Sequence, residues 1–393
     1  MRNILCRINV YAVVIIVLLN MVSCRWFSSP EEDLLKAVME NDIAAVRHAL
    51  EHKADTNTRN QEGKTPLMLT TNLEVAILLL EHGANVNARI PKEKTFTGGW
   101  TALNFAEAKN LSEMIELLKK AGAKSLKQLD AEEALWKTLG FSPPQPDLEV
   151  VQKALLDGAD VNVRNEQGET PLMKMADCGT HWGRIKEEKE NEAKYINIFK
   201  MLLTHGADVN AKNGKDQTSE YDGYIGYTAL MRAARGCNSI EIFQLLFNYG
   251  ADGNIKTDRT PLIMAAWNGN VDILTLLLQH GANINEQERG GRTALISAAY
   301  GSDYPDAIKL LLQHGANINE QDNEGYTPLI AAAELSMVEN LKVLLENGAD
   351  INVKVNAGKH KGWTALKFAK QNQKKGVNNS DECVRLLTQA GAK

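Results

Sequence analysis

Histidine is the residue type that most suggests chemistry in this chain. Five of its eight histidines stand just before a Gly-Ala step or its first, degenerate copy, and a row of imidazoles could hold metal ions. The same positions close predicted helices, where a polar or cationic side chain suits the negative end of the helix dipole. We expect this helix-end role and no metal. The five are His52, His82, His205, His280 and His314.

The sequence contains no complete catalytic motif. Gly63-Lys64-Thr65 resembles the end of a phosphate-binding loop, but Thr58 stands where that loop requires glycine. The sequence has no H-E-x-x-H, no G-x-S-x-G and no dinucleotide-binding glycine pattern. Cysteines occur without a C-x-x-C pair, and we interpret Cys178 and Cys237 as small core residues at helix ends. The sequence therefore predicts no catalytic residue, no cofactor and no metal.

The N-terminus has the pattern of a targeting signal. Residues 1–7 hold two arginines and no acid, and residues 8–22 form an apolar run that ends before Ser23-Cys24. This run is shorter than the roughly 20 residues of a membrane-spanning helix, so 1–23 is predicted to be a signal peptide. The stretch L-N-M-V-S-C resembles the lipobox of bacterial lipoproteins, although Met21 stands where that family prefers leucine. The resemblance implies lipid attachment at Cys24 and a tether over 24–30. The alternative is an ordinary cleaved signal.

Composition and charge describe a folded protein with an acidic surface. Hydrophobic residues make up 44% of the 393 residues and charged residues 24%. The formal charge is −5, and removal of residues 1–23 takes away two arginines, leaving 42 basic against 49 acidic residues, or −7. Nucleic acid is therefore not an expected partner, because phosphate binding requires clustered Lys and Arg.

Two landmarks recur along the rest of the chain. Thr-(Pro/Ala)-Leu begins at Thr65, Thr101, Thr170, Thr228, Thr260, Thr293, Thr327 and Thr364. Gly-Ala-(Asp/Asn/Lys) begins at Gly83, Gly122, Gly158, Gly206, Gly250, Gly281, Gly315, Gly348 and Gly391. Threonine followed by proline starts a helix, and glycine ends one. The landmarks predict a first helix, a second helix such as Val271 to His280 with Leu277 on its core face, and a polar reversal.

This arrangement resembles the ankyrin-repeat family from about Glu32 to Lys393. It implies an all-α solenoid of about ten helix-turn-helix repeats with short projecting β-hairpin fingers. The family's T-P-L-H pattern lacks its histidine here, and apolar residues such as Ile263 can pack in its place. We predict repeats one to three over 31–124, an irregular connection with the first helix of repeat four over 125–146, and the remaining repeats over 147–393. One continuous stack is the alternative to two fused arrays. Insertions at 179–194 and 213–227 break the period.

The family resemblance implies protein binding on a concave surface, formed by the finger tips and the first helices. Two rows of positions face that surface: the residue before each Thr and the residue after the small pair that ends each first helix. In repeats six to nine these rows hold aromatic and arginine residues, types that dominate binding hot spots. The arginines are expected to pair with carboxylates of a partner, whereas finger aromatics such as Trp100 and Trp363 could instead brace the neighbouring finger. The predicted binding residues are Tyr227, Arg235, Arg259, Trp267, Arg292, Tyr300 and Tyr326.

The sequence as a whole predicts an exported, lipid-anchored bacterial module, monomeric, that binds a protein. Its expected place is the cell membrane or outer membrane, facing the periplasm or the surface. An inhibitor or accessory subunit of an enzyme in the same compartment is the alternative, and an enzyme in its own right is disfavoured by the failed motifs.

Overall fold

The computed structural model describes residues 29–93, 97–139, 146–177, 189–214, 225–301 and 303–393. Within these residues the chain forms twenty helices and no strand. The helices fall into ten consecutive pairs, so the predicted all-helical solenoid of ten repeats is confirmed. The signal segment, Cys24 and most of both insertions lie outside the described residues.

The chain divides into two compact units, Met1–Asp130 and Ala131–Lys393. The helices of the first unit are α2 (Pro30–Glu40), α3 (Ile43–Glu51), α4 (Pro66–Leu69), α5 (Leu73–Glu81), α6 (Ala102–Ala108) and α7 (Ser112–Lys120). Helix α8 (Leu126–Thr138) spans the division. Each unit has a core of its own, and the division falls within the segment 125–146 that the sequence marks as irregular.

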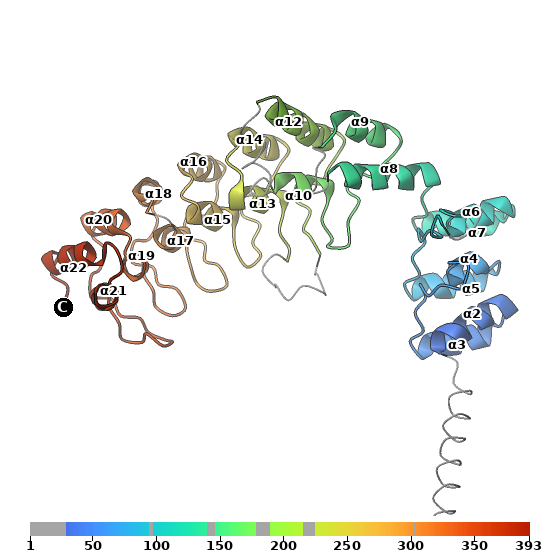
Figure 1. Cartoon of the computed structure of the whole chain (residues 1–393), viewed down its shortest axis with the longest axis horizontal. Coiled ribbons are helices and arrows are strands. Elements are labelled where there is room, and N and C mark those ends of the chain that lie inside the picture. Colours follow the sequence, from blue (N-terminus) through green and yellow to red (C-terminus); the bar gives the residue numbers. More distant parts are fainter. Residues whose placement is uncertain (1–28, 94–96, 140–145, 178–188, 215–224, 302) are drawn as a thin grey trace, which may run out of the picture. The chain divides into compact units, whose positions relative to one another are not determined.

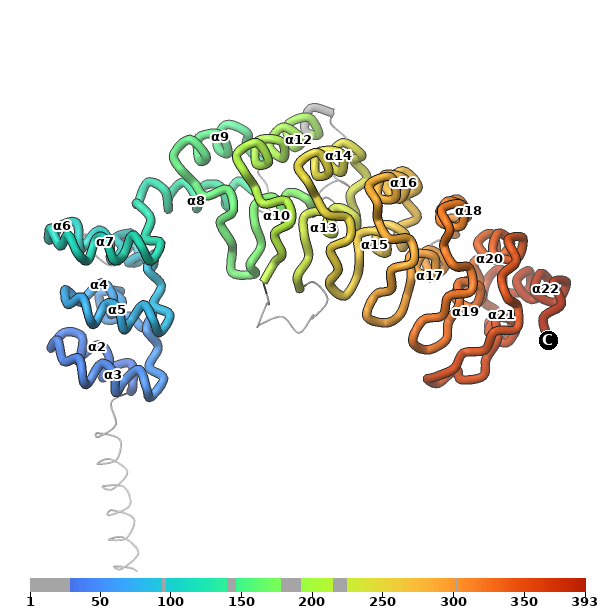
Figure 2. Tube along the Cα trace, turned by 180° about the vertical axis from the view of Figure 1, so that it is seen from behind, coloured from blue at the N-terminus to red at the C-terminus, as the bar shows by residue number. Residues whose placement is uncertain are grey.

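The second unit consists of two layers of helices. After α8, the first helices are α10 (Pro171–Ala176), α13 (Ala229–Gly236), α15 (Pro261–Trp267), α17 (Ala294–Tyr300), α19 (Pro328–Glu334) and α21 (Ala365–Lys374). The second helices are α9 (Leu148–Leu156), α12 (Lys189–Thr204), α14 (Ile240–Asn248), α16 (Val271–Gln279), α18 (Pro305–Gln313), α20 (Val338–Glu346) and α22 (Ser380–Gln389). The loops between repeats project on the side of the first helices (Figures 1 and 2).

Capping explains where the helices begin and end. The Thr260 hydroxyl accepts a hydrogen bond from the backbone N–H of Ile263, and the equivalent threonines of the other repeats in the second unit cap in the same way. Gly281 follows its helix at φ +80°, a left-handed conformation that glycine adopts without strain. His52, His82, His280 and His314 are the C-cap residues of second helices, which confirms the helix-end role.

The core lies between the layers. Leu277, Leu274 and Ile273 of α16 are buried, as their spacing predicts, and so is the alanine pair of α15. Ile263, at the position of the missing family histidine, is buried as well. Apolar packing therefore replaces the lost polar residue.

Asparagine side chains join successive repeats. Asn254 donates from Nδ2 to the carbonyl of Gly281 and accepts from the N–H of Asn283, both at 2.9 Å. Asn57, Asn87, Asn162, Asn210 and Asn285 make the same pair of bonds. Leu126 occupies the corresponding position after Gly122, so the ladder has no asparagine there. This missing step lies next to the boundary between the two units.

The projecting loops contain no strand in the described residues, whereas the sequence predicted β-hairpins. In the third repeat Ile90 donates to the carbonyl of Trp100 and accepts from Gly99, and Val355 does the same with Trp363 and Gly362. Two such bonds close a loop without forming a strand in the described residues. These two fingers are therefore loops closed at their base by backbone hydrogen bonds.

Candidate protein-binding surface

Trp267 and Tyr300 end the first helices of two successive repeats, α15 and α17, which pack against each other. The Trp267 side chain is large, apolar and 47% exposed. No hydrogen bond, ion pair or ring contact joins its indole to another residue in the described part of the chain. Packing of the repeat therefore does not require a tryptophan at this position.

Tyr300 is held more firmly than Trp267. Its hydroxyl donates to Glu334 Oε2 at 3.1 Å, and the Arg292 guanidinium lies 4.8 Å from the centre of its ring. Burial, followed by the Glu334 carboxylate, raises the pKa of the Tyr300 hydroxyl well above its ordinary value. The phenol therefore stays protonated and remains the donor. Tyr300 is partly buried, and its hydroxyl is taken up by the bond to Glu334.

Tyr227 and Tyr326 lie inside the molecule, with only 3% and 5% of their surface exposed. The Tyr326 hydroxyl lies 2.7 Å from His360 Nδ1, and its ring packs against Phe368. Burial is the main cause that raises the pKa of Tyr326 to about 12, with Glu334 second. These two residues contribute packing, and little of either is available to a partner.

The three predicted arginines already have acidic neighbours within the chain. Arg235 donates from Nη2 to both Asp177 oxygens at 3.0 and 3.2 Å. Arg259 Nε lies 3.0 Å from Glu288, and Arg292 Nε lies between Glu288 and Asp322 at 3.9 and 3.7 Å. The repeats therefore supply carboxylates to these arginines themselves, while 36–48% of each arginine side chain stays exposed.

A buried cluster of charged side chains lies next to Arg235, and the sequence analysis did not predict it. Arg232 pairs with Glu169 at 2.7 Å and approaches Asp177 at 3.9 Å, with all three side chains largely buried. Lys174 lies in the same cluster, and desolvation is the main cause that lowers its pKa. The signal was present in the sequence, because Lys174 and Arg232 stand where Met264 and Ala331 stand in other repeats.

The finger aromatics contact their own neighbours. Trp100 packs edge-on against Phe105 with ring centres 5.2 Å apart. Trp363 lies 4.9 Å from Phe368 and 4.7 Å from His360, with the Lys367 ammonium 4.8 Å from its ring. These contacts lie within each tryptophan's own finger and the helix that follows it, so in the described residues they show packing inside one repeat and no contact with the neighbouring finger.

Further exposed apolar side chains lie in the turns between first and second helices. Tyr304 is 48% exposed, Leu335 is 42% and Val377 is 41%. They belong to the three repeats that follow Trp267. The two sequence rows did not include Tyr304, because it lies at the start of the second helix, α18, and not at the end of the first helix. We call Trp267, Tyr304, Leu335 and Val377 together the turn edge.

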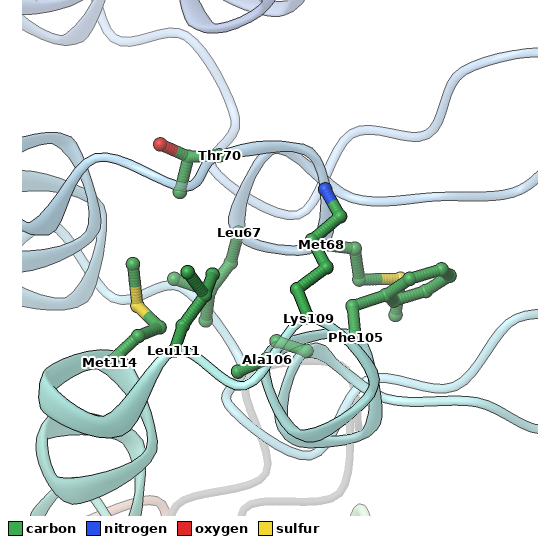
Figure 3. A pocket seen from close by; sticks show the side chains of 9 residues that line it. Leu67, Met68, Thr70, Phe105, Ala106, Lys109, Leu111 and Met114 are labelled. Atoms are coloured by element: carbon green, nitrogen blue, oxygen red, sulfur yellow. The ribbon is translucent and has the colours of Figure 1, made fainter.

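The first unit has a small hollow beside its shortest helix (Figure 3). Helix α4 has four residues and α6 has seven, so Thr70 turns away early and leaves Leu67 and Met68 facing Phe105 and Leu111. The hollow has a volume of about 10 Å³, which is room for about one water molecule. It is too small for an organic ligand.

The described residues contain no cluster of three His, Cys, Asp or Glu side chains that could hold a metal ion. Among the same residues, no helix combines the length and the apolar character needed to cross a membrane.

Comparison with known proteins decides the family. A family model for ankyrin repeats matches residues 34–128, 190–288 and 262–355, more than half of the chain. The chain belongs to the ankyrin-repeat family. Ankyrin repeats indicate a module for protein–protein interaction, and this agrees with a surface of exposed aromatic residues on stacked helices.

Several ankyrin-repeat proteins are similar in sequence over parts of their length. The B-cell lymphoma 3 protein homolog of Mus musculus is 39% identical over 82 residues, 20% of this chain and 18% of that protein. Ankyrin repeat and SOCS box protein 6 of Homo sapiens is 35% identical over 175 residues, 44% of this chain and 38% of that protein. Neurogenic locus notch homolog protein 1 of Xenopus laevis is 30% identical over 177 residues, 44% of this chain and 6% of that protein. The matches thus span less than two fifths of each relative.

Proposed function

We propose that this ankyrin-repeat protein is an exported, lipid-anchored module that binds a protein partner through the first-helix side of repeats six to nine. The observation that carries the proposal is the exposed Trp267 side chain, which no contact of the fold requires. Large aromatic side chains supply much of the binding energy at protein interfaces. Tyr300 borders the same surface from the next repeat.

The side chains around Trp267 are also held in place by contacts within the protein. Arg259 and Arg292 are held by Glu288, and Tyr300 is held by Glu334 and Arg292. Side chains fixed in this way lose little conformational freedom when a partner binds. The proposed binding surface is therefore rigid around one exposed indole.

Partner capture from the protein's own cells tests the surface. The double variant Trp267→Ala, Tyr300→Ala is expected to lose the captured partner, and Trp267→Ala alone is expected to remove most of it. Tyr249→Ala is the matched control, because Tyr249 is an exposed aromatic residue at the end of a second helix, α14. Equal capture by the parent and by Trp267→Ala, with equal unfolding midpoints, would contradict the proposal.

Lipid attachment is tested separately. The proposal rests on the basic segment 1–7, the apolar run 8–22 and Ser23-Cys24. Cys24→Ser is expected to move the protein from the membrane fraction to the soluble fraction, with Cys237→Ser as a control for loss of a thiol elsewhere. Unchanged membrane partition of the Cys24 variant would show that the segment anchors the protein by some other means.

A further inference from the structure

The last repeat, which contains α21 and α22 (Figure 1), has an uneven distribution of charge. Residues 351–380 contain no acidic residue and no arginine, although the chain as a whole has a formal charge of −5. The seven lysines of this segment give it a formal charge of +7, so the rest of the chain sums to −12. The small net charge of the chain therefore hides one basic segment. Its lysines are Lys354, Lys359, Lys361, Lys367, Lys370, Lys374 and Lys375.

All seven lysines are exposed and lack an acidic partner. The structure describes the whole segment, and within the described residues no ion pair and no side-chain hydrogen bond engages their ammonium groups. The acidic residues that follow the segment have other partners, since Asp381 accepts from Gln373 and Glu382 pairs with Arg385. The Glu324 carboxylate of the preceding finger lies beside the backbone of this segment and pairs with none of the seven in the described structure.

Three of the lysines lie on one face of α21. Lys367, Lys370 and Lys374 are spaced by three and four residues, which places them on the same side of a helix. In α19, Ile330 and Ala333 hold the positions of the first two, and both are buried. The face of α21 that corresponds to an apolar packing face in α19 is therefore basic and exposed.

The finger of the last repeat continues the same basic surface. Two backbone hydrogen bonds close this finger, and Lys354 and Lys361 each directly precede a residue that makes them. The Lys367 ammonium lies 4.8 Å from the centre of the Trp363 ring, which joins the finger to the helix face. We call the seven lysines together the lysine patch.

The fold of the repeat does not require these lysines. Repeat three begins with the same Gly-Trp-Thr-Ala-Leu-x-Phe-Ala pattern, and it has Asn104 and Glu107 at the positions of Lys367 and Lys370. An end repeat needs a polar outer face, and side chains of either charge supply one. Capping therefore explains why these residues are polar, but not why all the charged ones are lysine. The excess of one sign points to an anionic ligand.

The choice of lysine favours phosphates over carboxylates. Largely buried carboxylates of the second unit are held by arginines, as Glu169 is by Arg232 and Asp177 by Arg235. The planar guanidinium matches the geometry of a carboxylate, whereas an ammonium binds phosphate as a point charge. The lysine patch extends over a finger, a helix and a turn, so it suits an extended anionic surface better than one phosphate group.

Two neighbouring features favour lipid over nucleic acid. Val377 of the turn edge is 41% exposed and follows Lys374 and Lys375 in the same turn. An aliphatic side chain beside lysines is stabilised at the boundary between headgroups and acyl chains. Trp363 is partly buried and packs on Phe368, so it does not offer the open ring on which unpaired bases stack.

We infer that the lysine patch of the last repeat binds a membrane surface that contains anionic phospholipids, with the ammonium groups against the phosphates and Val377 beneath them. Each lysine near such a surface strengthens binding by about fivefold. This contact is separate from the proposed partner surface around Trp267 and is additional to the proposed lipid at Cys24.

Co-sedimentation of the full-length protein with vesicles tests the inference. One set of vesicles is phosphatidylcholine alone, and the other is equal parts of phosphatidylcholine and phosphatidylglycerol. The N-terminal segment is the same in every variant, so a change in the ratio of the two partition coefficients reports the lysines. Combined replacement of Lys367, Lys370 and Lys374 by glutamine is expected to lower this ratio by about a hundredfold, since each lysine contributes about fivefold.

A matched control removes the same charge from repeat three. Lys109, Lys119 and Lys120 are exposed and have no ion pair in the described structure. Their combined replacement by glutamine is expected to leave the ratio nearly unchanged. Trp267→Ala is expected to lose partner capture and to keep vesicle binding, so the two surfaces can fail separately.

Three outcomes would overturn the inference. The first is an equal ratio for the parent and the glutamine variant of the patch, with equal urea midpoints. The second is an equal loss in the control, because net charge alone would then explain the binding. The third is displacement from the vesicles at physiological salt by a DNA duplex or by a polyglutamate peptide at matched charge, which would assign the patch to nucleic acid or to an acidic protein segment. The vesicle ratio is expected to fall as salt rises, because exposed charges are screened.

Discussion

The two units of this protein differ most in the turns that join their first and second helices. In repeats seven to ten each turn exposes a large apolar side chain: Trp267, Tyr304, Leu335 or Val377. In the first unit the exposed residues at the tips of these turns are polar, namely Asn41, Thr71 and Asn110, and one large apolar side chain near a helix end, Met39, is 63% exposed. The shared fold does not require apolar residues at these positions. The second unit exposes such a side chain in four successive repeats.

The units also differ in how ion pairs join repeats. Arg47 and Glu74 connect the first two repeats at 3.0 Å, with both side chains about half exposed. Arg232 and Glu169 connect repeats six and five at 2.7 Å, with both side chains largely buried. Buried charges are costly unless they are paired, so the second unit depends on its pair in a way the first does not.

The largest expected effect on stability comes from a large-to-small substitution in the core of one unit while the core of the other unit is unchanged. Leu277→Ala in the second unit and Leu79→Ala in the first each remove a fully buried side chain, and each is expected to destabilise by about 2–5 kcal/mol. Urea denaturation gives the loss, and hydrogen exchange read by mass spectrometry locates it. Each variant is expected to speed exchange in its own unit, because a repeat contacts only its neighbours.

The conservative variant Leu277→Met serves as the control, with an expected loss below about 1.5 kcal/mol. Faster exchange in both units from either alanine variant would mean that the ten repeats unfold as one cooperative stack. That result would decide between two fused arrays and one continuous stack in favour of the latter.

Removal of one acid from each inter-repeat ion pair is the next test. Glu169→Ala leaves Arg232 buried beside Asp177 alone, and is expected to cost about 3 kcal/mol. Glu74→Ala removes an exposed partner, and is expected to cost no more than about 0.5 kcal/mol. Unfolding midpoints in urea measure both.

A double variant separates burial from pairing. Glu169→Leu with Arg232→Met leaves no charge of this pair in the interior and is expected to recover much of the stability lost in Glu169→Ala. Equal losses for Glu169→Ala and Glu74→Ala would show that water reaches the Arg232 cluster and that the contrast between the units is smaller than their burial indicates.

Much of the fold could be predicted from the sequence because its signals are local and repeated. Threonine at eight of the starts, glycine at nine of the ends and leucine at helical spacing indicate the ten helix pairs, and each signal acts within a few residues of itself. The missing asparagine at Leu126 was equally visible. Its meaning depends on the inter-repeat bonds that Asn87 and Asn162 make, and only the structure shows those.

The candidate site was less predictable because it depends on neighbours from other repeats. The position of a residue within its repeat predicts the side of the solenoid on which the residue lies. It does not predict which side chain of a neighbouring repeat will cover that residue. Tyr326 is covered because the longer loop before Trp363 brings His360 to its hydroxyl. Tyr304 was missed because it precedes a second helix, whereas both rows follow fingers and first helices. Trp267 kept its predicted exposure because no neighbouring side chain pairs with its indole in the described residues.

The smallest expected effect concerns the threonine caps, where the two units differ in a single hydrogen bond. Thr260 caps α15 through its hydroxyl, whereas Thr65 Oγ1 is buried without a partner in the described structure and α4 has no side-chain cap bond. Valine has nearly the shape of threonine and lacks the oxygen. Thr260→Val is therefore expected to cost about 1 kcal/mol, the usual value of a cap. Thr65→Val is expected to leave stability unchanged or raise it slightly, because it removes a buried oxygen that has no partner. Urea unfolding midpoints of the two variants, measured in parallel, give both changes in stability. Because threonine and valine are both β-branched, the effect of side-chain shape on helix stability cancels in the comparison. A loss of about 1 kcal/mol in Thr65→Val as well would show that its hydroxyl caps α4 in solution, and the capping contrast between the units would disappear.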